Sequence, residues 1–386
     1  MSLVTGHAMS APAASEHNGD RSPSVSIRDV ARAAGVSYQT VSRVINGSPS
    51  VKTSTRQTVL DAIDALGFHP NRAARALAGG PVQSVTVLAS NTSLYGFAAA
   101  LEGIEEQTRE AGFAMGVRVV ESVAASDVSD AVRRALDPAG ALIVIAFDRA
   151  GIAALGCVPP GAPVVAMVPA PADGKAPGYP AVWIDEYQAA REATQYLVSL
   201  GHKSVHHLSI PSWNGPTRRL SGWRSALEEA GISVPKPVLA GWTAAGGYEC
   251  ARKLAADPDV TALLCGNDDI ALGAIRAMHE AGRTVPADVS IIGFDDVPMA
   301  RFYTPALTTV RQDFKALGKT CFAELQSVLN PGLPGGRQRQ PRASLVIRES
   351  AGPPPSRPRR KAGSAAQGAA AGLRTVVPGR AKVPDV

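Results

Sequence analysis

The part of the chain before Gly80 contains three short stretches in which apolar residues recur every three or four positions, the spacing of one helix face. Each stretch starts at a Ser or Thr that can cap a helix, and the stretches run from Ser26 to Gly35, from Ser37 to about Ile45, and from Thr53 to Gly67. Asp29 follows Ser26 by three residues, as in a capping box. In the third stretch Val59, Leu60, Ile63 and Leu66 form the apolar face. The pattern predicts an all-α domain over residues 26–70.

From Val82 the pattern changes to short continuous apolar runs that alternate with amphipathic helical segments. The runs read SVTVLAS, ALIVIAF, PVVAMV, VHHLSI, ALLCG and VSIIGF. Continuous apolar strands separated by helices are typical of parallel sheets with both faces covered. Residues 82–350 are therefore expected to form two doubly wound parallel-sheet α/β lobes.

The two ends of the chain lack any such periodicity, and we expect residues 1–25 and 351–386 to be disordered. Residues 1–21 lack the basic and apolar regions of a secretory signal, and no apolar run is long enough to span a membrane. The four cysteines show no CxxC pair and no histidine at ligand spacing. We therefore expect free thiols in a cytoplasmic protein and no metal site.

The formal charge of +6 is concentrated at the ends of this pattern. Residues 26–80 contain seven Lys or Arg against three Asp or Glu, and residues 351–386 contain seven against one. The core between them is mildly acidic. A basic helical domain and a basic tail suggest a polyanionic partner at the ends of the chain rather than on its core.

The first two predicted helices, joined by a turn at Gly35, have the layout of a helix-turn-helix. In that layout the start of the second helix reaches base edges in the major groove, and here those residues are Ser37, Tyr38, Gln39, Thr40, Ser42 and Arg43. Gln can pair with adenine and Arg with guanine through two hydrogen bonds each. A three-helix packing domain with a solvated polar face would give the same pattern, so the pattern alone leaves both interpretations open.

The stretch SIRDVARAAGVSYQTVSRVINGSPSVKTSTRQTVLDAIDALGFHPNRAARALAGG resembles, without gaps, the head and hinge of the lac-repressor family. The similarity continues to about Arg348. It implies a transcriptional repressor rather than an enzyme, and one that needs no cofactor. Such a repressor binds palindromic operator DNA and is therefore expected in the cytoplasm, associated with the nucleoid. It also implies that residues 82–181 and 314–341 form one lobe of a sugar-binding core, and residues 182–311 and 342–350 the other.

The resemblance also assigns the DNA contacts by position. Tyr38, Gln39 and Arg43 match base-reading positions. The positions that contact phosphates in the family are occupied here by Ser37, Thr40, Ser42, Asn46 and Thr55. Asn71, Arg72, Ala74 and Leu77 match the hinge helix, within residues 71–81, which in the family forms only on the operator and wedges a leucine into the minor groove. So short a helix is not stable alone, which agrees with order induced by DNA. The alternative is that Leu77 packs against the core.

In parallel α/β lobes, ligands bind beyond the carboxyl ends of the strands. No nucleophile–base set and no phosphate loop follows those strands, and we interpret Asp296 as a turn residue and His202, His206 and His207 as structural. By resemblance, the residues that hydrogen-bond ligand hydroxyls are Arg219, Asn267 and Asp295. Gln312 and Phe314 match the crossover between lobes, Ser90, Leu94, Gly96 and Phe97 the wall of the first lobe, and Trp183 and Trp242 apolar pocket positions.

One departure from the family concerns the ligand. Where the founding member has an acidic pocket residue, PVVAMVPAP places Val168 or Pro169, which weighs against a galactoside and leaves a saccharide favoured. A purine or nucleoside effector, or a corepressor, is the alternative, and a secreted sugar-binding protein would share the core but not the head. The leucine heptads that form tetramers in the family are absent, since residues 351–386 contain one leucine. We therefore expect a homodimer, particularly through the first lobe.

Overall fold

The computed structural model describes residues 25–45, 48, 50–68, 84–136, 140–171, 178–212, 215–331 and 341–356. The chain divides into two compact units, Met1–Pro81 and Val82–Val386, which are referred to below as the head and the core. Five of the residues expected to contact DNA lie outside the described residues, namely Asn46, Asn71, Arg72, Ala74 and Leu77.

The head consists of α1 (Ile27–Ala33), α2 (Tyr38–Ile45) and α3 (Thr53–Leu66). The Asp29 carboxylate accepts hydrogen bonds from the backbone N–H of Ser26 at 3.0 Å and from its hydroxyl at 2.6 Å, which fixes the start of α1. The Ser37 hydroxyl accepts from the N–H of Thr40 at 3.1 Å and starts α2 in the same way. These are the caps that the sequence predicted for the first two helices.

The third helix begins one residue earlier than expected, because Thr53 was predicted to be its cap. Thr53 is already the first residue of α3, and Lys52 precedes it without a side-chain cap. Leu60, expected to face inward, is 42% exposed, while Val59 and Ala62 are buried. Leu60 directly follows Val59, so it lies roughly 100° around α3 from the buried face that holds Val59 and Ala62.

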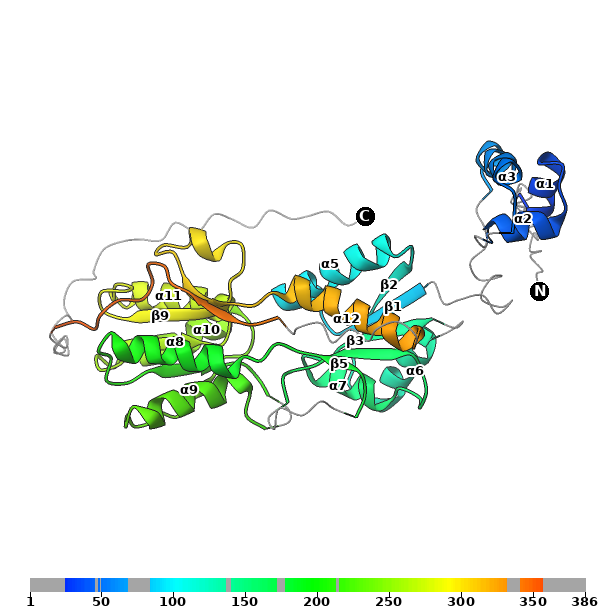
Figure 1. The fold of residues 1–386 in the computed structure, drawn as a ribbon. Coiled ribbons are helices and arrows are strands. Elements are labelled where there is room, and N and C mark those ends of the chain that lie inside the picture. Colours follow the sequence, from blue (N-terminus) through cyan, green and yellow to red (C-terminus); the bar gives the residue numbers. More distant parts are fainter. Residues whose placement is uncertain are drawn as a thin grey trace, which may run out of the picture. The chain divides into compact units, whose positions relative to one another are not determined.

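The first lobe of the core is a five-stranded parallel sheet in the order β2-β1-β3-β4-β5 (Figure 1). Its elements are β1 (Ser84–Ala89), α5 (Tyr95–Glu110), β2 (Ala114–Val119), α6 (Ala125–Leu136), β3 (Ala141–Ile145), α7 (Arg149–Gly156), β4 (Val164–Met167) and β5 (Ala181–Val182). All five residues of β3 are buried, because this central strand has helices over both faces. Burial on both faces explains why β3 contains no polar residue.

The second lobe is a six-stranded sheet in the order β11-β10-β9-β8-β6-β7. Its elements are α8 (Tyr187–Ser199), β6 (His206–Ser209), α9 (Arg218–Glu229), β7 (Val238–Leu239), α10 (Ala244–Leu254), β8 (Ala262–Cys265), α11 (Asp268–Glu280), β9 (Ser290–Asp295), η1 (Ala300–Phe302), β10 (Thr308–Arg311) and β11 (Ser344–Val346). The edge strand β11 runs antiparallel to β10, so this sheet is mixed rather than wholly parallel.

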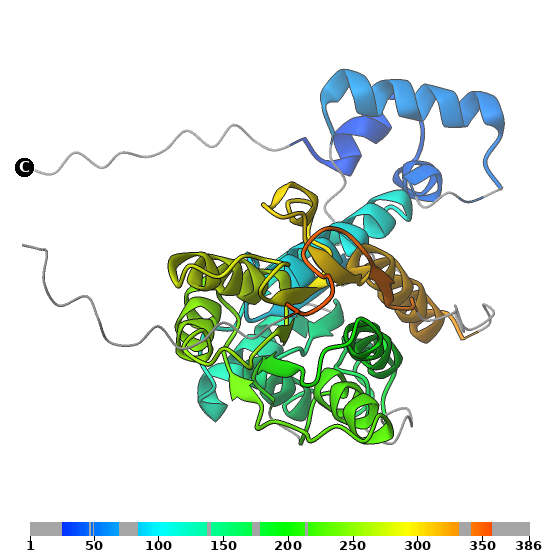
Figure 2. The same ribbon diagram turned by 90° about the vertical axis from the view of Figure 1, so that its left-hand side faces the viewer.

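The chain returns to the first lobe through α12 (Phe314–Leu329), which packs along α5 (Figures 1 and 2). Two glycines allow this close packing. A Cβ atom at Gly103 of α5 would overlap the carbonyl oxygen of Lys315, and one at Gly318 of α12 would overlap the carbonyl oxygen of Ala100. The first lobe is therefore completed by a helix that follows most of the second lobe in the sequence.

Residues 351–356, expected to begin a disordered tail, are instead placed against the second lobe. The Gly352 carbonyl accepts hydrogen bonds from the Ser290 hydroxyl at 2.8 Å and from Nε2 of His202 at 3.0 Å. The Pro and Gly content that suggested disorder does not prevent these backbone contacts. Residues 357–386 lie outside the described residues.

The described part of the chain has no helix long and apolar enough to cross a membrane and no cluster of side chains suited to a metal ion. The four cysteines are free thiols, as expected. His202 bridges Thr261, Ser290 and Gly352, and His207 is buried with its Nδ1 bonded to the Leu264 carbonyl at 2.8 Å. Both histidines are structural in this sense.

Replacing Gly103 by alanine tests the packing of α5 against α12. The added methyl group would meet a backbone carbonyl, which cannot move aside as a flexible side chain would. The overpacking cost of about 1–3 kcal/mol exceeds the helix-propensity gain of up to about 1 kcal/mol. We expect Gly103→Ala to lower the midpoint of thermal unfolding by several degrees, measured by circular dichroism.

Gly116→Ala is the matched control, because a Cβ at Gly116 on β2 would enter open space. We expect that control to stay within about 0.5 kcal/mol of the parent protein. A Gly103→Ala protein that unfolds at or above the parent midpoint would show that the two helices are not closely packed there.

Candidate effector site between the lobes and candidate DNA-reading surface

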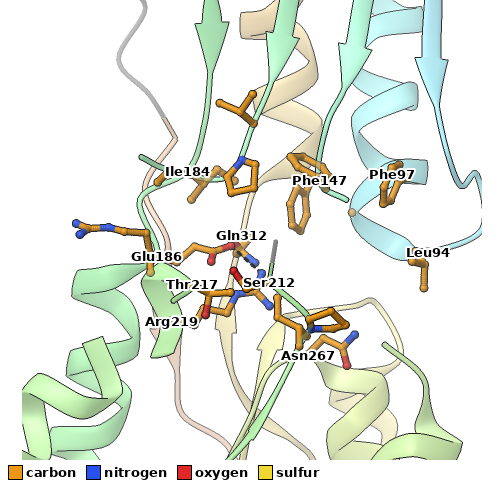
Figure 3. Close-up of a pocket in the computed structure, with 18 of the residues that line it drawn as sticks. Leu94, Phe97, Phe147, Ile184, Glu186, Ser212, Thr217, Arg219, Asn267 and Gln312 are labelled. Atoms are coloured by element: carbon orange, nitrogen blue, oxygen red, sulfur yellow. Dashed lines mark hydrogen bonds and ion pairs between the residues drawn. The ribbon is translucent and has the colours of Figure 1, made fainter. Parts of the chain in front are cut away.

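A cavity of about 500 Å³ lies between the two lobes of the core, beyond the carboxyl ends of their strands (Figure 3). Its residues follow β1, β3 and β4 of the first lobe and β6, β8, β9 and β10 of the second. The volume is in the range of small-molecule sites in proteins. The position is the one that the strand-end rule predicts for parallel α/β lobes.

The wall contributed by the first lobe is almost wholly apolar (Figure 3). The side chains that form it include Leu94, Phe97, Phe147, Val168, Pro169, Tyr179, Ile184, Phe314 and Leu317. The Phe147 ring meets the Phe97 ring edge to face at 5.4 Å between centroids and lies 6.1 Å from the Phe314 ring. Gly96 lies directly over the Phe314 ring, where a Cβ would come within 3.1 Å.

The wall contributed by the second lobe is polar. Its side chains include Glu186, Ser212, Thr217, Arg219, Asn267, Asp269, Asp295 and Gln312. In Figure 3 Arg219, Glu186 and Gln312 lie together, across the cavity from Phe147. The cavity therefore matches a ligand with one hydrogen-bonding side and one apolar side.

Arg219 is the central charged group of this wall and is 4% exposed. It lies in the first turn of α9, where the Thr217 hydroxyl caps the helix by accepting from the N–H of Leu220 at 3.1 Å. Its Nη2 donates to Glu186 Oε1 at 2.7 Å and lies 3.6 Å from Asp295 Oδ1. The guanidinium also stacks on the Phe294 ring, 4.4 Å from the centroid.

Burial opposes the charge of Arg219, but the carboxylates of Glu186 and Asp295 raise its pKa, so the guanidinium stays protonated. The same burial raises the pKa of Asp295 to about 7, although Arg219 and a hydrogen bond from Gln312 Nε2 at 2.7 Å act in the opposite direction. The carboxyl of Asp295 thus gains and loses a proton near neutral pH.

Asp295, the last residue of β9, and Asp296 after it have positive φ angles of 109° and 56°, so the chain turns sharply at the cavity. Asp296 faces away from it and pairs with Arg311 at 2.7 Å and Arg348 at 2.6 Å. These pairs support the interpretation of Asp296 as a turn residue.

Asn267 caps α11, and both the oxygen and the nitrogen of its side-chain amide are hydrogen-bonded to the backbone. Its Oδ1 accepts from the N–H of Ile270 at 2.8 Å, and its Nδ2 donates to the carbonyl of Trp242 at 2.9 Å. The neighbouring Asp268 is fully buried and accepts from the Thr309 hydroxyl at 2.5 Å and from the N–H of Val297 at 2.8 Å. Burial and the nearby Asp295 hold the pKa of Asp268 well above its usual value.

The structure brings most of the sequence-predicted ligand residues to this cavity. Those that line it are Leu94, Gly96, Phe97, Arg219, Trp242, Asn267, Asp295, Gln312 and Phe314. Ser90 and Trp183 are not among the lining residues. The Ser90 hydroxyl donates to the carboxylate of Asp148, which caps α7, and the half-buried Trp183 packs against the apolar cluster beneath α6 and α7.

Several lining residues were missed by the sequence analysis, above all Glu186, Asp269 and Phe147. Phe147 follows β3 and Glu186 follows β5 by a few residues, so the strand-end rule could have identified both. Val168 and Pro169 line the cavity without an acidic group, and Glu186 supplies a carboxylate from the start of α8 instead.

The candidate DNA-reading surface is the outer face of α2. Ser37, Tyr38, Gln39 and Arg43 are exposed, and Tyr38 is 53% exposed although it is a large aromatic residue. Thr40, Ser42 and Thr55 are half-buried. The opposite face holds Val41 and Val44 in the head core. A rigid helix thus presents an aromatic, an amide and a guanidinium side chain to solvent.

Asp295 predicts a pH dependence of stability. Because its pKa rises from 3.8 to about 7 on folding, the unfolded chain loses this proton first, and stability falls as pH rises between about 4 and 7. Asp295→Asn keeps a neutral group at every pH. We expect its thermal midpoint to exceed that of the parent by more at pH 8 than at pH 5. The exposed Asp259→Asn is the control, and an unchanged difference between the two pH values would refute the shifted pKa.

Residues 26–71 match the model of bacterial regulatory proteins of the lacI family, and residues 194–351 match that of a periplasmic binding protein-like domain. The lactose operon repressor of Escherichia coli is 32% identical over 84% of this chain and 90% of its own length. The HTH-type transcriptional repressor PurR of Pasteurella multocida is 32% identical over 84% of this chain and 98% of its own.

Solved structures give the same relationship. A lac repressor dimer bound to operator and the anti-inducer ONPF is 30% identical, with a TM-score of 0.73, and the match covers 85% of this chain and 99% of that one. A complex of the transcriptional regulator CelR with cellobiose is 26% identical, with a TM-score of 0.61, over 85% of this chain and all of that one. With a head, a two-lobed core and a relative that is 32% identical over 84% of its length, this chain belongs to the lacI family of bacterial regulatory proteins.

Proposed function

We propose that this chain is a transcriptional repressor that binds a palindromic operator as a homodimer and changes its DNA affinity when a small ligand enters the inter-lobe cavity. The observation that carries the proposal is the presence, in one chain, of the exposed face of α2 and of a cavity with one polar and one apolar wall. The lactose operon repressor and PurR, similar over most of the chain, are repressors rather than enzymes.

In this proposal α2 lies in the major groove, and Tyr38, Gln39 and Arg43 contact base edges. Ser37, Thr40, Ser42 and Thr55 contact phosphates, since hydroxyl groups near helix starts suit that role. Residues 71–81 act as the hinge, in which Leu77 enters the minor groove. Binding to chromosomal DNA would place the protein in the cytoplasm, in association with the nucleoid.

Exposed apolar side chains on the core support a homodimer. Val117 and Val119 of the edge strand β2 are 47% and 44% exposed, while Met299 and Phe302 beside η1 are 61% and 71% exposed. Large apolar groups that remain exposed in a monomer mark surfaces for association. The solved lac repressor that this chain resembles is a dimer on its operator.

The ligand that we propose is a sugar or a sugar derivative. Arg219, Asp295 and Gln312 offer donors and acceptors suited to hydroxyl groups, and the rings of the first lobe suit the apolar face of a sugar. A purine or nucleoside effector is the second candidate, because Phe147 and Phe314 also offer surfaces on which a flat base could stack. Either compound would act by binding one arrangement of the lobes more tightly than the other.

Arg43→Ala tests DNA reading. Loss of a base-contacting guanidinium should weaken binding to the selected operator by about 1–3 kcal/mol. Fluorescence anisotropy at a fixed, stated salt concentration measures this, after the operator has been selected from a duplex library. Arg32→Ala on α1, whose side chain is 81% exposed, is the control and should keep the parent affinity. Equal affinity of the Arg43 variant and the parent for the operator would exclude base contact by Arg43.

Arg219→Ala tests the effector site. Sugars and nucleosides are first screened for compounds that change the operator affinity of the parent protein. We expect the variant to bind operator DNA normally but to lose the response, since a lost charged hydrogen bond costs about 1.5–3 kcal/mol. Arg224→Ala, on the exposed side of the same helix, should respond like the parent. A normal response of the Arg219 variant would show that the ligand binds elsewhere.

A further inference from the structure

The polar wall of the inter-lobe cavity carries more negative than positive charge. Its charged lining residues are the carboxylates Glu186, Asp269 and Asp295 and the guanidinium groups of Arg218 and Arg219. Arg218 is committed elsewhere, because its Nε and Nη2 both lie 3.2 Å from the carboxylate of Asp185, and its guanidinium stacks on the Tyr187 ring. Arg219 is therefore the cation that faces three carboxylates.

Arg219 is itself shared between two of those carboxylates, at 2.7 Å from Glu186 and 3.6 Å from Asp295. Directly behind this wall the buried carboxyl of Asp268 is bonded to Thr309 and to the backbone of Val297, with no ion pair to a described residue. Because burial holds the pKa of Asp268 well above its usual value and raises that of Asp295 to about 7, the negative charge that Arg219 does not balance comes mainly from Asp269 and from the ionised fraction of Asp295.

The pKa values of neighbouring groups are raised first by burial, and nearby carboxyls add to the shift at Asp268 and Tyr303. Burial raises the pKa of Asp269, and burial together with Asp295 raises that of Asp268. Burial, Asp268 and Asp269 also raise the pKa of the Tyr303 hydroxyl to about 12. In each case the environment disfavours a further negative charge.

The wall also has an acceptor without a donor. Gln312 is 2% exposed and lines the cavity, and its Nε2 donates to Asp295. Its Oε1 is buried and has no hydrogen-bond partner among the described residues. Because a buried acceptor without a partner is costly, the Gln312 carbonyl oxygen favours a ligand with a hydrogen-bond donor.

The opposite wall suits an organic cation too. Phe97, Phe147 and Phe314 form a connected group of rings across the cavity from Arg219 and Glu186 (Figure 3). Aromatic faces attract cations through their quadrupole, most strongly where water is displaced. Carboxylates on one side and aromatic rings on the other form a site that is complementary to a protonated amine with an apolar body.

We propose that the ligand of this cavity is an organic amine in its protonated form, with its ammonium group against the carboxylates of the second lobe and its apolar part against the phenylalanines of the first. The inference rests on the proposed function only in treating this ligand as the effector. It narrows the sugar-derivative class to amine-bearing compounds. It excludes phosphorylated or carboxylated compounds, since an anion would find one guanidinium already paired with two carboxylates.

A matched set of probes tests the charge preference without knowledge of the natural ligand. Benzylamine, benzyl alcohol and benzoate share one ring and differ mainly in charge, which is positive, neutral and negative at pH 7. Their dissociation constants for the full-length protein, without DNA, are measured by NMR titration. We expect benzylamine to bind about tenfold more tightly than benzyl alcohol, and benzoate to bind most weakly.

Equal affinity for amine and alcohol would overturn the inference in favour of a neutral ligand. Tighter binding of benzoate, or the absence of saturable binding by benzylamine, would overturn it as well. Operator binding is measured separately on the same preparation. Failure of the proposed repressor function would thus appear as lost DNA binding, whereas failure of this inference would appear only in the order of the three probes.

A pair of glutamate variants links the preference to the cavity wall. Glu186→Gln keeps the size of the side chain and removes one carboxylate, so the ratio of amine to alcohol affinity should fall about fivefold. Glu192→Gln removes an exposed carboxylate from the same helix, α8, and should leave the ratio unchanged. An unchanged ratio in the Glu186 variant would contradict the inference.

Discussion

The contact on which the polar wall of the cavity depends is the buried ion pair between Arg219 and Glu186, with Asp295 and Gln312 beside it. Glu186 lies where the chain first passes from β5 to the second lobe, and Gln312 lies where it passes back to α12. Arg219 and Asp295 belong to the second lobe itself. The Arg219 guanidinium and its neighbour Asp295 therefore connect both passages of the chain between the lobes to the polar wall of the second lobe. A ligand that competes for any member of this set acts on the connections between the lobes.

The ion pairs of Arg219 are costly to bury, and their hydrogen-bond geometry offsets part of that cost. Two charges taken out of water are stabilised only when hydrogen bonds satisfy their remaining polar atoms. Arg219 satisfies this partly, through Glu186, the Gly266 carbonyl and the Phe294 ring, while its Nε has no partner among the described residues. Incomplete satisfaction at a cavity wall is characteristic of groups held ready for a ligand rather than for stability.

Local pattern was sufficient to predict the elements of this chain but not every member of the site. The spacing of Val30, Val41 and Val59 indicated three helices, and ALIVI indicated a strand buried on both faces, because periodicity directly reflects burial. Trp183 packs against the cluster beneath α6 and α7, because it directly follows the end of β5 and an aromatic residue at a strand end can pack on either face of the sheet. The strand-end rule could have placed Glu186 at the cavity, but its ion pair with Arg219, 33 residues away, is revealed by no local pattern.

The position of α12 has a consequence for synthesis on the ribosome. Leu317, Cys321, Phe322 and Leu325 of α12 belong to the same apolar cluster as Val85 and Ile143 of the first sheet. Until α12 has left the ribosome, that face of the first lobe is covered by α5 alone, although its own strands end at Val182. An incomplete chain therefore carries a partly uncovered apolar face on its first lobe from the end of β5 at Val182 to the end of α12 at Leu329.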